Sequence, residues 1–389
     1  MRSLTSSIDT LARERVSLLA GRWRSDAPPL KGLTDNPVYQ WWRDPTITQP
    51  DSWWGLAEQE EALAEQFNLM RELGVQVFRM ELPWFAVAPE RPGGAIYDGA
   101  AARDQDWPGY RWERFDLLAR LAAQAGVRLV PQVVFAPVWS SGVPTTRQGG
   151  ATAPPGSAAH VGDFLTALAG RYRGRIHYWE LWNEPDHPHS WSGTLRQYVE
   201  VVLLPGAEAA RSVDSACQIV LGGLADHRNL AAIYAAGGGP AFDIVSFHLY
   251  PTRPSAGQVR RALRRVGAQM KRSGDWRKPV WLTECGLATQ PPSTPSPFGG
   301  ATSEARQARF IRALYRSVEA QAICWYQLRD TCILDAAGQE LKRVYWGLVS
   351  RDLTRRKPGF EAYRRASALP LDDSSPPVPK KPGGLPSAR

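Results

Sequence analysis

Two glutamates stand at the ends of short apolar runs in this chain of 389 residues. Glu184 comes just after Ile176–Trp182, and Glu284 comes directly after Pro279–Thr283, 100 residues further along. Short apolar runs of this kind predict buried strands. Strands of a parallel sheet end at one edge, and two carboxylates that meet there are the groups needed to cleave a glycosidic bond. The pattern therefore predicts a pair in which one carboxyl is the acid/base and the other is the nucleophile.

Helical and strand patterns alternate from about residue 56 to the last expected strand. Near-continuous apolar strands that alternate strictly with helices predict a parallel sheet covered by helices, and eight such units close into a (β/α)₈ TIM barrel. A doubly wound open sheet is the alternative, although no Gly-rich phosphate turn follows the first clear strand. The first strand is expected near Pro37–Trp42. The other seven are expected at Val75–Met80, Val127–Phe135, Ile176–Trp182, Ile219–Leu221, Phe242–Leu249, Val280–Glu284 and Ala322–Leu328.

The sequence predicts a single α/β domain with two flanking segments. Residues 31–368 form the expected TIM-barrel catalytic domain, and residues 1–30 are a polar N-terminal extension. Residues 369–389 contain six prolines and few large apolar side chains, so they are expected to be a disordered tail. A linker to another domain is the alternative for this tail.

The chain carries a formal charge of +9, from 47 basic and 38 acidic residues, and only seven of the basic residues are Lys. One interpretation is a surface that binds an acidic polymer, either a nucleic acid or a uronate-bearing polysaccharide. The other is arginine spread over the outer helices as ordinary solvated charge. No basic run is interleaved with aromatic residues, so nucleic acid is not expected as a partner.

The four cysteines show no close metal-type spacing and are expected to be small buried side chains. Disulfide bonds would require export from the cell. They are Cys217, Cys285, Cys324 and Cys332.

The N-terminal segment does not predict a signal peptide, because Arg13, Glu14 and Arg15 interrupt the apolar core that one needs. No run has the length needed to span a bilayer. We therefore expect a cytoplasmic protein with no membrane partner, and we expect it to be a monomer.

The residues at the ends of these strands resemble those of the clan-A retaining glycoside hydrolases, the β-xylosidase-like families and their endo-acting relatives in particular. The resemblance covers roughly residues 70–365. It rests on Asn183-Glu184-Pro185 after the fourth strand, Glu284 on the seventh, Asp243–Tyr250 on the sixth, Trp325 on the eighth, and the closing segments Tyr345–Val349 and Arg356–Pro358.

The resemblance implies a role for each of the two carboxyls. Glu184 would be the general acid and then the base, and Glu284 would be the nucleophile, with the two carboxyl groups about 5–5.5 Å apart. Arg79 would keep Glu284 charged, because a nearby opposite charge lowers a carboxyl pKa. Alternatively, Arg79 is a structural ion-pair partner of Glu81 or Glu180.

Four further residues would contact the sugar or the carboxyls. Asn183 would bind the sugar 2-hydroxyl, and Tyr250 would orient Glu284. His248 would line the sugar or acid site, and Trp325 would form a flat apolar floor for the sugar ring. The alternative for His248, Tyr250 and Trp325 is that they are ordinary core residues.

The sequence thus predicts a retaining glycoside hydrolase that acts on β-linked polysaccharides or oligosaccharides without cofactor or metal. A metal at Asp186, His187 and His189 is the alternative to polar lining of the site. A carbohydrate-binding barrel without turnover and a transglycosylase are the alternative functions. Trp41, Trp42, Trp53 and Trp54 indicate either stacking subsites for a long glycan or a buried cluster at the barrel floor.

Overall fold

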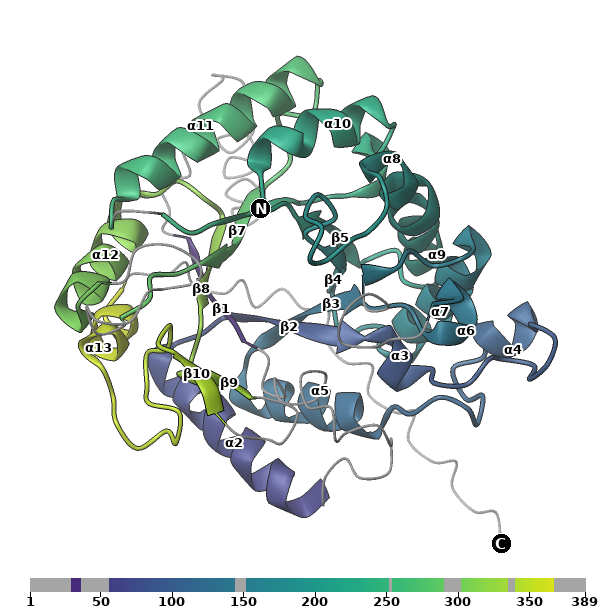
Figure 1. Cartoon of the computed structure of the whole chain (residues 1–389), viewed down its shortest axis with the longest axis horizontal. Coiled ribbons are helices and arrows are strands. Elements are labelled where there is room, and N and C mark those ends of the chain that lie inside the picture. The colour runs from purple at the N-terminus through teal and green to yellow at the C-terminus, as the bar shows by residue number, and fades with distance from the viewer. Residues whose placement is uncertain are drawn as a thin grey trace, which may run out of the picture.

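The computed structural model describes residues 29–35, 56–143, 152–251, 254–289, 302–334 and 340–366. Eight parallel strands form a sheet in the order β5-β4-β3-β2-β1-β8-β7-β6, and bridges Val220–Ile244 and Leu224–Phe247 join its two edges. The result is the predicted (β/α)₈ barrel (Figure 1). Its strands are β1 (Leu30–Thr34), β2 (Val77–Pro83), β3 (Arg128–Val134), β4 (Tyr178–Asn183), β5 (Gln218–Gly223), β6 (Val245–Leu249), β7 (Val280–Cys285) and β8 (Ala322–Tyr326).

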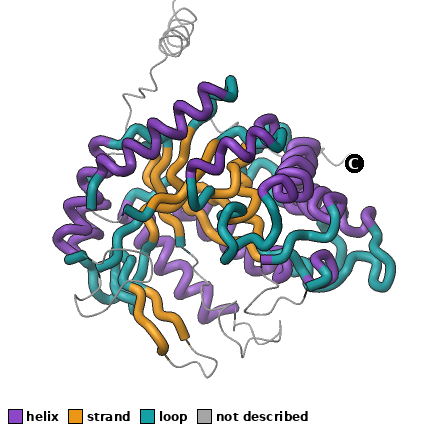
Figure 2. Tube along the Cα trace, turned by 45° about the horizontal axis from the view of Figure 1, so that its top comes forward, coloured by secondary structure: helices purple, strands orange, loops and turns teal. Residues whose placement is uncertain are grey.

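Helices surround the strands on the outside, as Figure 2 shows from a second direction. The longer ones are α2 (Leu56–Leu73), α5 (Glu113–Ala125), α7 (Ala158–Arg171), α9 (Leu204–Val213), α11 (Ala256–Arg272), α12 (Glu304–Ser317) and α13 (Pro358–Arg364). The short ones are α3 (Trp84–Val87), α4 (Gly99–Arg103), α6 (Val138–Ser141), α8 (Leu195–Tyr198), α10 (Leu230–Ala235), the π-helical turn η3 (Val199–Leu203) and the 3₁₀ turns η4 (His227–Asn229) and η5 (Gly239–Ala241).

Local signals in the sequence explain where several helices begin and end. The Ser303 hydroxyl accepts a hydrogen bond from the backbone of Arg306 and caps the N-terminus of α12, as predicted. Helices α2 and α5 are followed by Gly74 and Gly126, whose φ angles of 67° and 70° lie in the left-handed region that glycine adopts without strain. These stops set the direction in which the next strand enters the barrel.

The inward-facing positions of the strands change from apolar to polar toward their C-terminal ends. Val77 and Val130 belong to the apolar cluster that fills the lower part of the barrel. Two residues further along the same faces come Arg79 and Gln132, and two after Tyr178 comes Glu180. Side chains two apart on a strand share a face, so the rim of the barrel is polar where its floor is packed.

The prediction of a first strand near Pro37–Trp42 was wrong, because the first strand is β1, which pairs in parallel with both β2 and β8. The predicted position lies outside the described residues. The charged Lys31 and the flexible Gly32 hid this strand from a search for apolar runs. Lys31 is 3% exposed, and its ammonium donates to the carbonyls of Leu73 (2.6 Å) and Arg364 (3.2 Å), which end two helices. A Cβ on Gly32 would lie 2.4 Å from Sγ of Cys324, so only glycine fits there.

An antiparallel hairpin of β9 (Thr331–Leu334) and β10 (Glu340–Val344) follows the barrel and was not predicted. The expected extension and tail lie almost wholly outside the described residues, so those domain limits stay predictions.

Among the described residues, Cys217, Cys285 and Cys324 are free thiols in buried positions. No helix in the described part of the chain combines the length and the apolar character that crossing a bilayer requires.

Candidate active site

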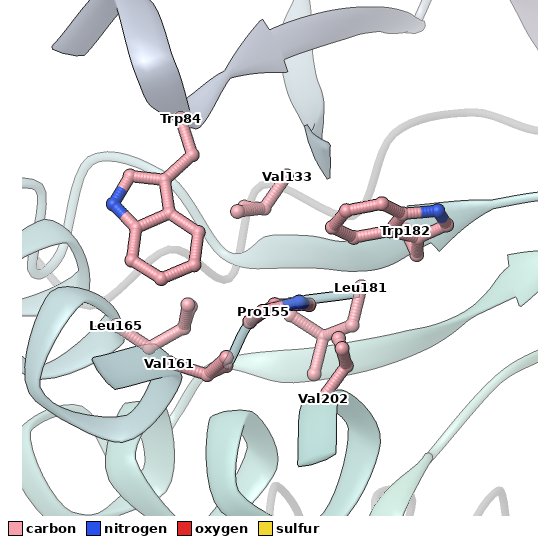
Figure 3. Close-up of a pocket in the computed structure, with 8 residues that line it drawn as sticks. All are labelled: Trp84, Val133, Pro155, Val161, Leu165, Leu181, Trp182 and Val202. Carbon is pink, nitrogen blue, oxygen red and sulfur yellow. The ribbon is translucent and has the colours of Figure 1, made fainter. Parts of the chain in front are cut away.

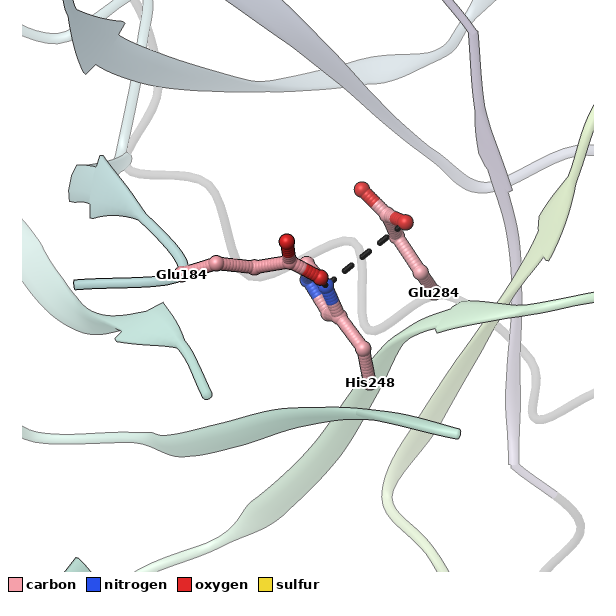
Figure 4. Close-up of side chains that lie close together, drawn as sticks. All are labelled: Glu184, His248 and Glu284. Atoms are coloured by element: carbon pink, nitrogen blue, oxygen red, sulfur yellow. Dashed lines mark hydrogen bonds and ion pairs between the residues drawn. The ribbon is translucent and has the colours of Figure 1, made fainter. Parts of the chain in front are cut away.

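Glu184 and Glu284 lie at the C-terminal ends of β4 and β7 and point toward one another across the barrel mouth, with His248 of β6 between them (Figure 4). Nδ1 of His248 lies 2.7 Å from Oε1 of Glu184 and 3.6 Å from Oε2 of Glu284. One possible ligand atom from each of the three residues, a carboxylate oxygen or an imidazole nitrogen, lies within 4.8 Å of the other two. The two carboxyl side chains are 21% and 14% exposed, so both are open to a small molecule at the mouth.

Arg79 connects Glu284 to a second, wholly buried carboxylate. Its Nη1 donates to Oε1 of Glu284 at 2.7 Å. Its Nε and Nη2 donate to the two oxygens of Glu180 at 2.5 and 3.0 Å. One guanidinium therefore contacts both Glu284 and the structural partner Glu180. The Glu180 side chain has no exposed surface, and such a carboxylate is stable only when it is paired and hydrogen-bonded.

The pKa of Glu284 lies below its ordinary value. Burial raises this pKa, but the positive charges of His248 and Arg79 and hydrogen bonds from Tyr250 and Arg79 outweigh the burial. Arg79 and Tyr250 donate to different oxygens of the carboxylate, so both oxygens are held. The pKa of His248 is shifted upward: burial lowers it, but the charge of Glu284 and the hydrogen bond and charge of Glu184 outweigh that effect. The site thus holds Glu284 in its ionised form.

Asn183 lies beside this network and is oriented by two donors. Its Oδ1 accepts from Nη2 of Arg79 at 3.0 Å and from Nε2 of Gln132 at 2.6 Å. Because the oxygen is held in this way, the orientation of the amide is fixed. Its nitrogen makes one long contact of 3.4 Å to Oγ of Ser190 and can donate to a ligand. Gln132 was not among the predicted residues, although an amide in an otherwise apolar strand run is a signal that identifies it.

The backbone of β4 departs from regular alternation just before Glu184. Trp182 has φ of 77° and Glu184 has φ of 40°, values that cost about 1–3 kcal/mol each in residues other than glycine. Leu181 and Trp182 both line the same small apolar void between the sheet and the helices (Figure 3). Two consecutive side chains therefore face the helix layer, and Asn183 faces the barrel interior where the regular alternation would have put Trp182.

Packing holds this irregular backbone in place. Nε1 of Trp182 donates to the carbonyl of Ser190 at 2.9 Å, and its ring meets Trp191 edge to face at 5.0 Å. The void beside it holds about 10 Å³, which is the room of one water molecule, and its apolar lining gives water no partner. The backbone amide of Glu184 donates to the carbonyl of Gly223 at 3.0 Å and fixes the start of the following loop.

The prediction that Trp325 forms the sugar floor was wrong. Trp325 has no exposed surface, and its ring packs on Phe310 of helix α12, outside the barrel. On β8 the inward-facing residues are Ala322 and Cys324, so alternation turns Trp325 outward and brings Tyr326 to the rim. The partly exposed aromatic rings near the rim are those of Tyr326 and Tyr250, which pack on the buried Trp346 with ring centroids 5.0–5.9 Å apart.

Among the described residues, Glu184, His248 and Glu284 lie close enough together to bind a cation. A cation there would have to displace Arg79 and Tyr250, which already donate to the two oxygens of Glu284. The alternative metal set does not gather in this way. Both carboxylate oxygens of Asp186 accept backbone hydrogen bonds from Ala225 and Asp226, which is a structural role in the loop after β5.

Three solved structures of glycoside hydrolases superpose on this chain. A family 39 glycoside hydrolase from Bacteroides cellulosilyticus WH2 superposes with a TM-score of 0.58 at 18% identity, over 88% of this chain and 64% of that one. A monomeric β-xylosidase from Caulobacter crescentus CB15 gives 0.59 at 18% identity, over 87% and 68%. A GH5_18 enzyme from Streptomyces cattleya in complex with GlcNAc gives 0.58 at 18% identity, over 87% and 80%. The chain has the fold of the clan-A glycoside hydrolases.

These similarities concern the fold, and the chain spans about two thirds of the length of the first two enzymes. No protein-family model matches the sequence. No curated protein sequence matches it either.

Proposed function

We propose that this chain is a retaining glycoside hydrolase that cleaves β-glycosidic bonds by double displacement. The observation that carries the proposal is the pair of carboxylates, Glu184 and Glu284, that face each other from β4 and β7 with ligand atoms within 4.8 Å. Retaining enzymes hold their carboxyls about 5–5.5 Å apart, whereas inverting enzymes leave about 6.5–9.5 Å for a water molecule. The short separation supports the retaining class.

The two carboxyls have different surroundings, which supports different roles. Glu284 receives hydrogen bonds from Arg79 and Tyr250 and has a lowered pKa, as a nucleophile that must stay ionised requires. Glu184 has a single hydrogen-bond partner among the described side chains, His248, and is the more exposed of the two. This arrangement fits a group that exchanges a proton with a leaving group and then with water.

The reaction proceeds in two balanced steps. Glu184 gives its proton to the glycosidic oxygen while a carboxylate oxygen of Glu284 attacks the anomeric carbon, so the bond to the leaving group breaks as a glycosyl ester forms. Glu184, now ionised, takes a proton from water, whose oxygen attacks the same carbon and releases Glu284. No cofactor enters either step.

Asn183 and Tyr326 are the proposed contacts to the sugar at the point of cleavage. The amide nitrogen of Asn183 can donate to a hydroxyl of the sugar while Arg79 and Gln132 hold the amide oxygen. The ring of Tyr326 takes the place of the flat apolar floor that was predicted for Trp325, since it is partly exposed beside Tyr250 and packs on the buried Trp346. An apolar wall with a few fixed polar groups is the usual form of a sugar site.

The test uses a panel of aryl β-glycosides with the wild-type chain and two variants. Glu284→Gln should abolish turnover. Glu184→Ala should keep activity on substrates with good leaving groups, which need no protonation, and should lose it on those with poor ones. A 2-deoxy-2-fluoro glycoside should add one sugar mass to Glu284, read by peptide mass spectrometry.

Turnover by Glu284→Gln at the wild-type rate would contradict the proposal, and so would a product with inverted anomeric configuration by NMR. Binding of glycans without hydrolysis of any of them would identify a binding barrel. Transfer to an added sugar acceptor in preference to water would identify a transglycosylase that uses the same intermediate.

A further inference from the structure

The excess positive charge of the chain is concentrated on two neighbouring helices. Helices α11 and α12 together contain ten of the 47 basic residues and one of the 38 acidic residues, so the rest of the chain is balanced with 37 of each. The entire net charge of +9 therefore equals the charge of this helix pair. The two helices lie side by side on the outside of the barrel (Figures 1 and 2).

All ten cations are exposed, and none forms a salt bridge with a carboxylate of the described residues. We call this surface the basic face. Its members are Arg260, Arg261, Arg264, Arg265, Lys271 and Arg272 of α11 and Arg306, Arg309, Arg312 and Arg316 of α12. The one acid, Glu304, is already paired with Arg355 at 2.7 Å. The long outer helix α2, which packs on α5 and α13, has the opposite character, with Glu60, Glu61, Glu65 and Glu72 against Arg71.

The basic face borders the side of the mouth that carries the proposed nucleophile. Helix α11 begins at Ala256, six residues after Tyr250, and α12 is the helix that follows β7, which ends beside Glu284. In a (β/α)₈ barrel each helix starts at the catalytic rim and runs down the outer wall. A polymer that leaves the mouth between β6 and β7 would therefore pass along the cations.

From this placement we infer that the basic face binds the acidic groups of a polyuronide, a polysaccharide with a carboxylate on each sugar, and that this polymer is the substrate class of the site. The inference rests on the proposed function. Nine of the ten cations are Arg, whose planar fork matches a carboxylate in bidentate geometry. The repeated pairs at i and i+4, Arg260 with Arg264 and Arg261 with Arg265, place successive cations along one side of the helix.

The composition of the basic face favours a polyuronide over a membrane surface and over a single-stranded nucleic acid. A helix that binds at a membrane surface exposes large apolar residues to enter the bilayer, and the exposed large apolar residues of the described chain are Ile96, Val138, Val143 and Leu204, none of them on α11 or α12. A single-stranded nucleic acid requires exposed aromatic rings for stacking, and the aromatic residues of α12, Phe310 and Tyr315, are buried.

The test measures binding separately from catalysis, with the full-length Glu284→Gln chain and β-linked polymannuronate, against neutral β-linked mannan as the matched polymer. Binding to polymannuronate should exceed binding to mannan and should weaken between 50 and 200 mM salt. Replacement of Arg264, Arg265, Arg309 and Arg312 by Gln should weaken it by roughly tenfold or more, since each exposed ion pair contributes a modest amount. Replacement of Arg71, Arg120, Arg173 and Arg196 by Gln removes the same charge elsewhere and should leave binding unchanged.

Equal losses in the two fourfold variants would overturn the inference, because net charge alone would then explain the binding. Equal binding to mannan, tighter binding to duplex DNA, dextran sulfate or phosphatidylserine vesicles, or no binding at all would overturn it as well. In the wild-type background, the basic-face variant should raise KM on the polymer and leave hydrolysis of a small aryl β-glycoside unchanged. Absence of hydrolysis of every aryl glycoside by the wild type, with polymer binding retained, would instead count against the proposed function.

Discussion

Arg79 and Glu284 lie 205 residues apart in the sequence, and Nη1 of the first donates to Oε1 of the second at 2.7 Å. The same guanidinium uses two other nitrogens for the fully buried Glu180. A fixed fork on β2 therefore sets the position of the carboxylate on β7 through a carboxylate on β4. The site depends on the geometry of this fork as well as on its charge.

Arg79→Lys should impair turnover although it keeps the positive charge. A lysine ammonium cannot reach Glu180 and Glu284 in the same geometry, so one charge-assisted hydrogen bond is lost, which costs about 1.5–3 kcal/mol. We expect kcat/KM on an aryl glycoside to fall roughly tenfold to a hundredfold, and the free energy of unfolding from urea titration to fall as well. Arg120→Lys is the control, since Arg120 pairs with Glu60 on the surface and such pairs contribute about 0–1 kcal/mol. Equal effects of the two substitutions would contradict the role given to the fork.

Tyr250→Phe should move the acid side of the pH profile. Burial raises the pKa of Glu284, but the charges of His248 and Arg79 and the Tyr250 hydrogen bond lower it by more than burial raises it. Wild-type activity should therefore persist at a pH below the ordinary pKa of a glutamate. Without the hydroxyl the pKa of Glu284 rises, and the fall of kcat/KM at low pH should shift to higher pH. The loss of this hydrogen bond should also reduce kcat roughly tenfold to a hundredfold.

The same substitution should change how stability depends on pH. A carboxyl with a depressed pKa in the folded state stabilises the fold above its unfolded pKa, and this contribution disappears as the pH falls through the folded value. Tyr250→Phe should therefore flatten the acid part of a plot of unfolding free energy against pH. Tyr234→Phe is the matched control, because the Tyr234 hydroxyl bonds Asp275 on the outer surface. An acid limb that stays in place in Tyr250→Phe would contradict the account of Glu284.

The sequence was sufficient to predict the seven strands after residue 74 and the gathering of Arg79, Asn183, Glu184, His248, Tyr250 and Glu284 at one rim. Parallel strands end at a common edge, so polar residues at the ends of apolar runs must converge there. Strand β1 was missed because its Lys31 and Gly32 are fixed by contacts with α2, α13 and β8, which no local pattern encodes.

Which side chain of a strand faces the site was harder to predict. On β4, the positive φ of Trp182 turns two consecutive residues outward, and on β7 the register with β6 shifts between Phe247 and His248. A one-residue change of this kind reverses every later side chain. The same uncertainty led to the choice of Trp325 in place of Tyr326, although the small Ala322 and Cys324 mark the inward face of β8.

Substitutions at Tyr326 and Trp325 should separate a sugar contact from a core residue. Tyr326→Ala should raise KM on aryl glycosides about tenfold with a small effect on stability, because the ring is partly exposed at the mouth. Trp325→Ala should lower the free energy of unfolding by about 3–5 kcal/mol, as expected for a wholly buried aromatic residue. Trp325→Phe keeps most of the packing and should leave KM unchanged. A raised KM in Trp325→Phe, or an unchanged KM in Tyr326→Ala, would contradict these two assignments.

Gly223 lies against Glu180, Glu184 and His248. Its replacement should change both the activity of the site and the free energy of unfolding, and the two can be measured separately. Its amide donates to Oε1 of Glu180 at 2.9 Å, and its carbonyl accepts from Glu184 at 3.0 Å. A Cβ there would lie 2.2 Å from Nε2 of His248, closer than atoms approach, so the imidazole would have to move. Since His248 holds Glu184, we expect Gly223→Ala to reduce kcat/KM at least about tenfold and to destabilise the fold by about 1–3 kcal/mol.

Gly267→Ala is the matched control for that substitution. Gly267 lies in the middle of α11 with open space around its Cα, so alanine should stabilise the helix by up to about 1 kcal/mol and leave activity unchanged. The measurement is kcat/KM together with urea unfolding for both variants. Because His248 bonds Glu184 at 2.7 Å and lies 3.6 Å from Glu284, a displaced imidazole should first weaken proton transfer by Glu184, the proposed acid. The activity loss in Gly223→Ala should therefore be smaller on substrates with good leaving groups, and an equal loss on all leaving groups would show that His248 acts on Glu284 instead.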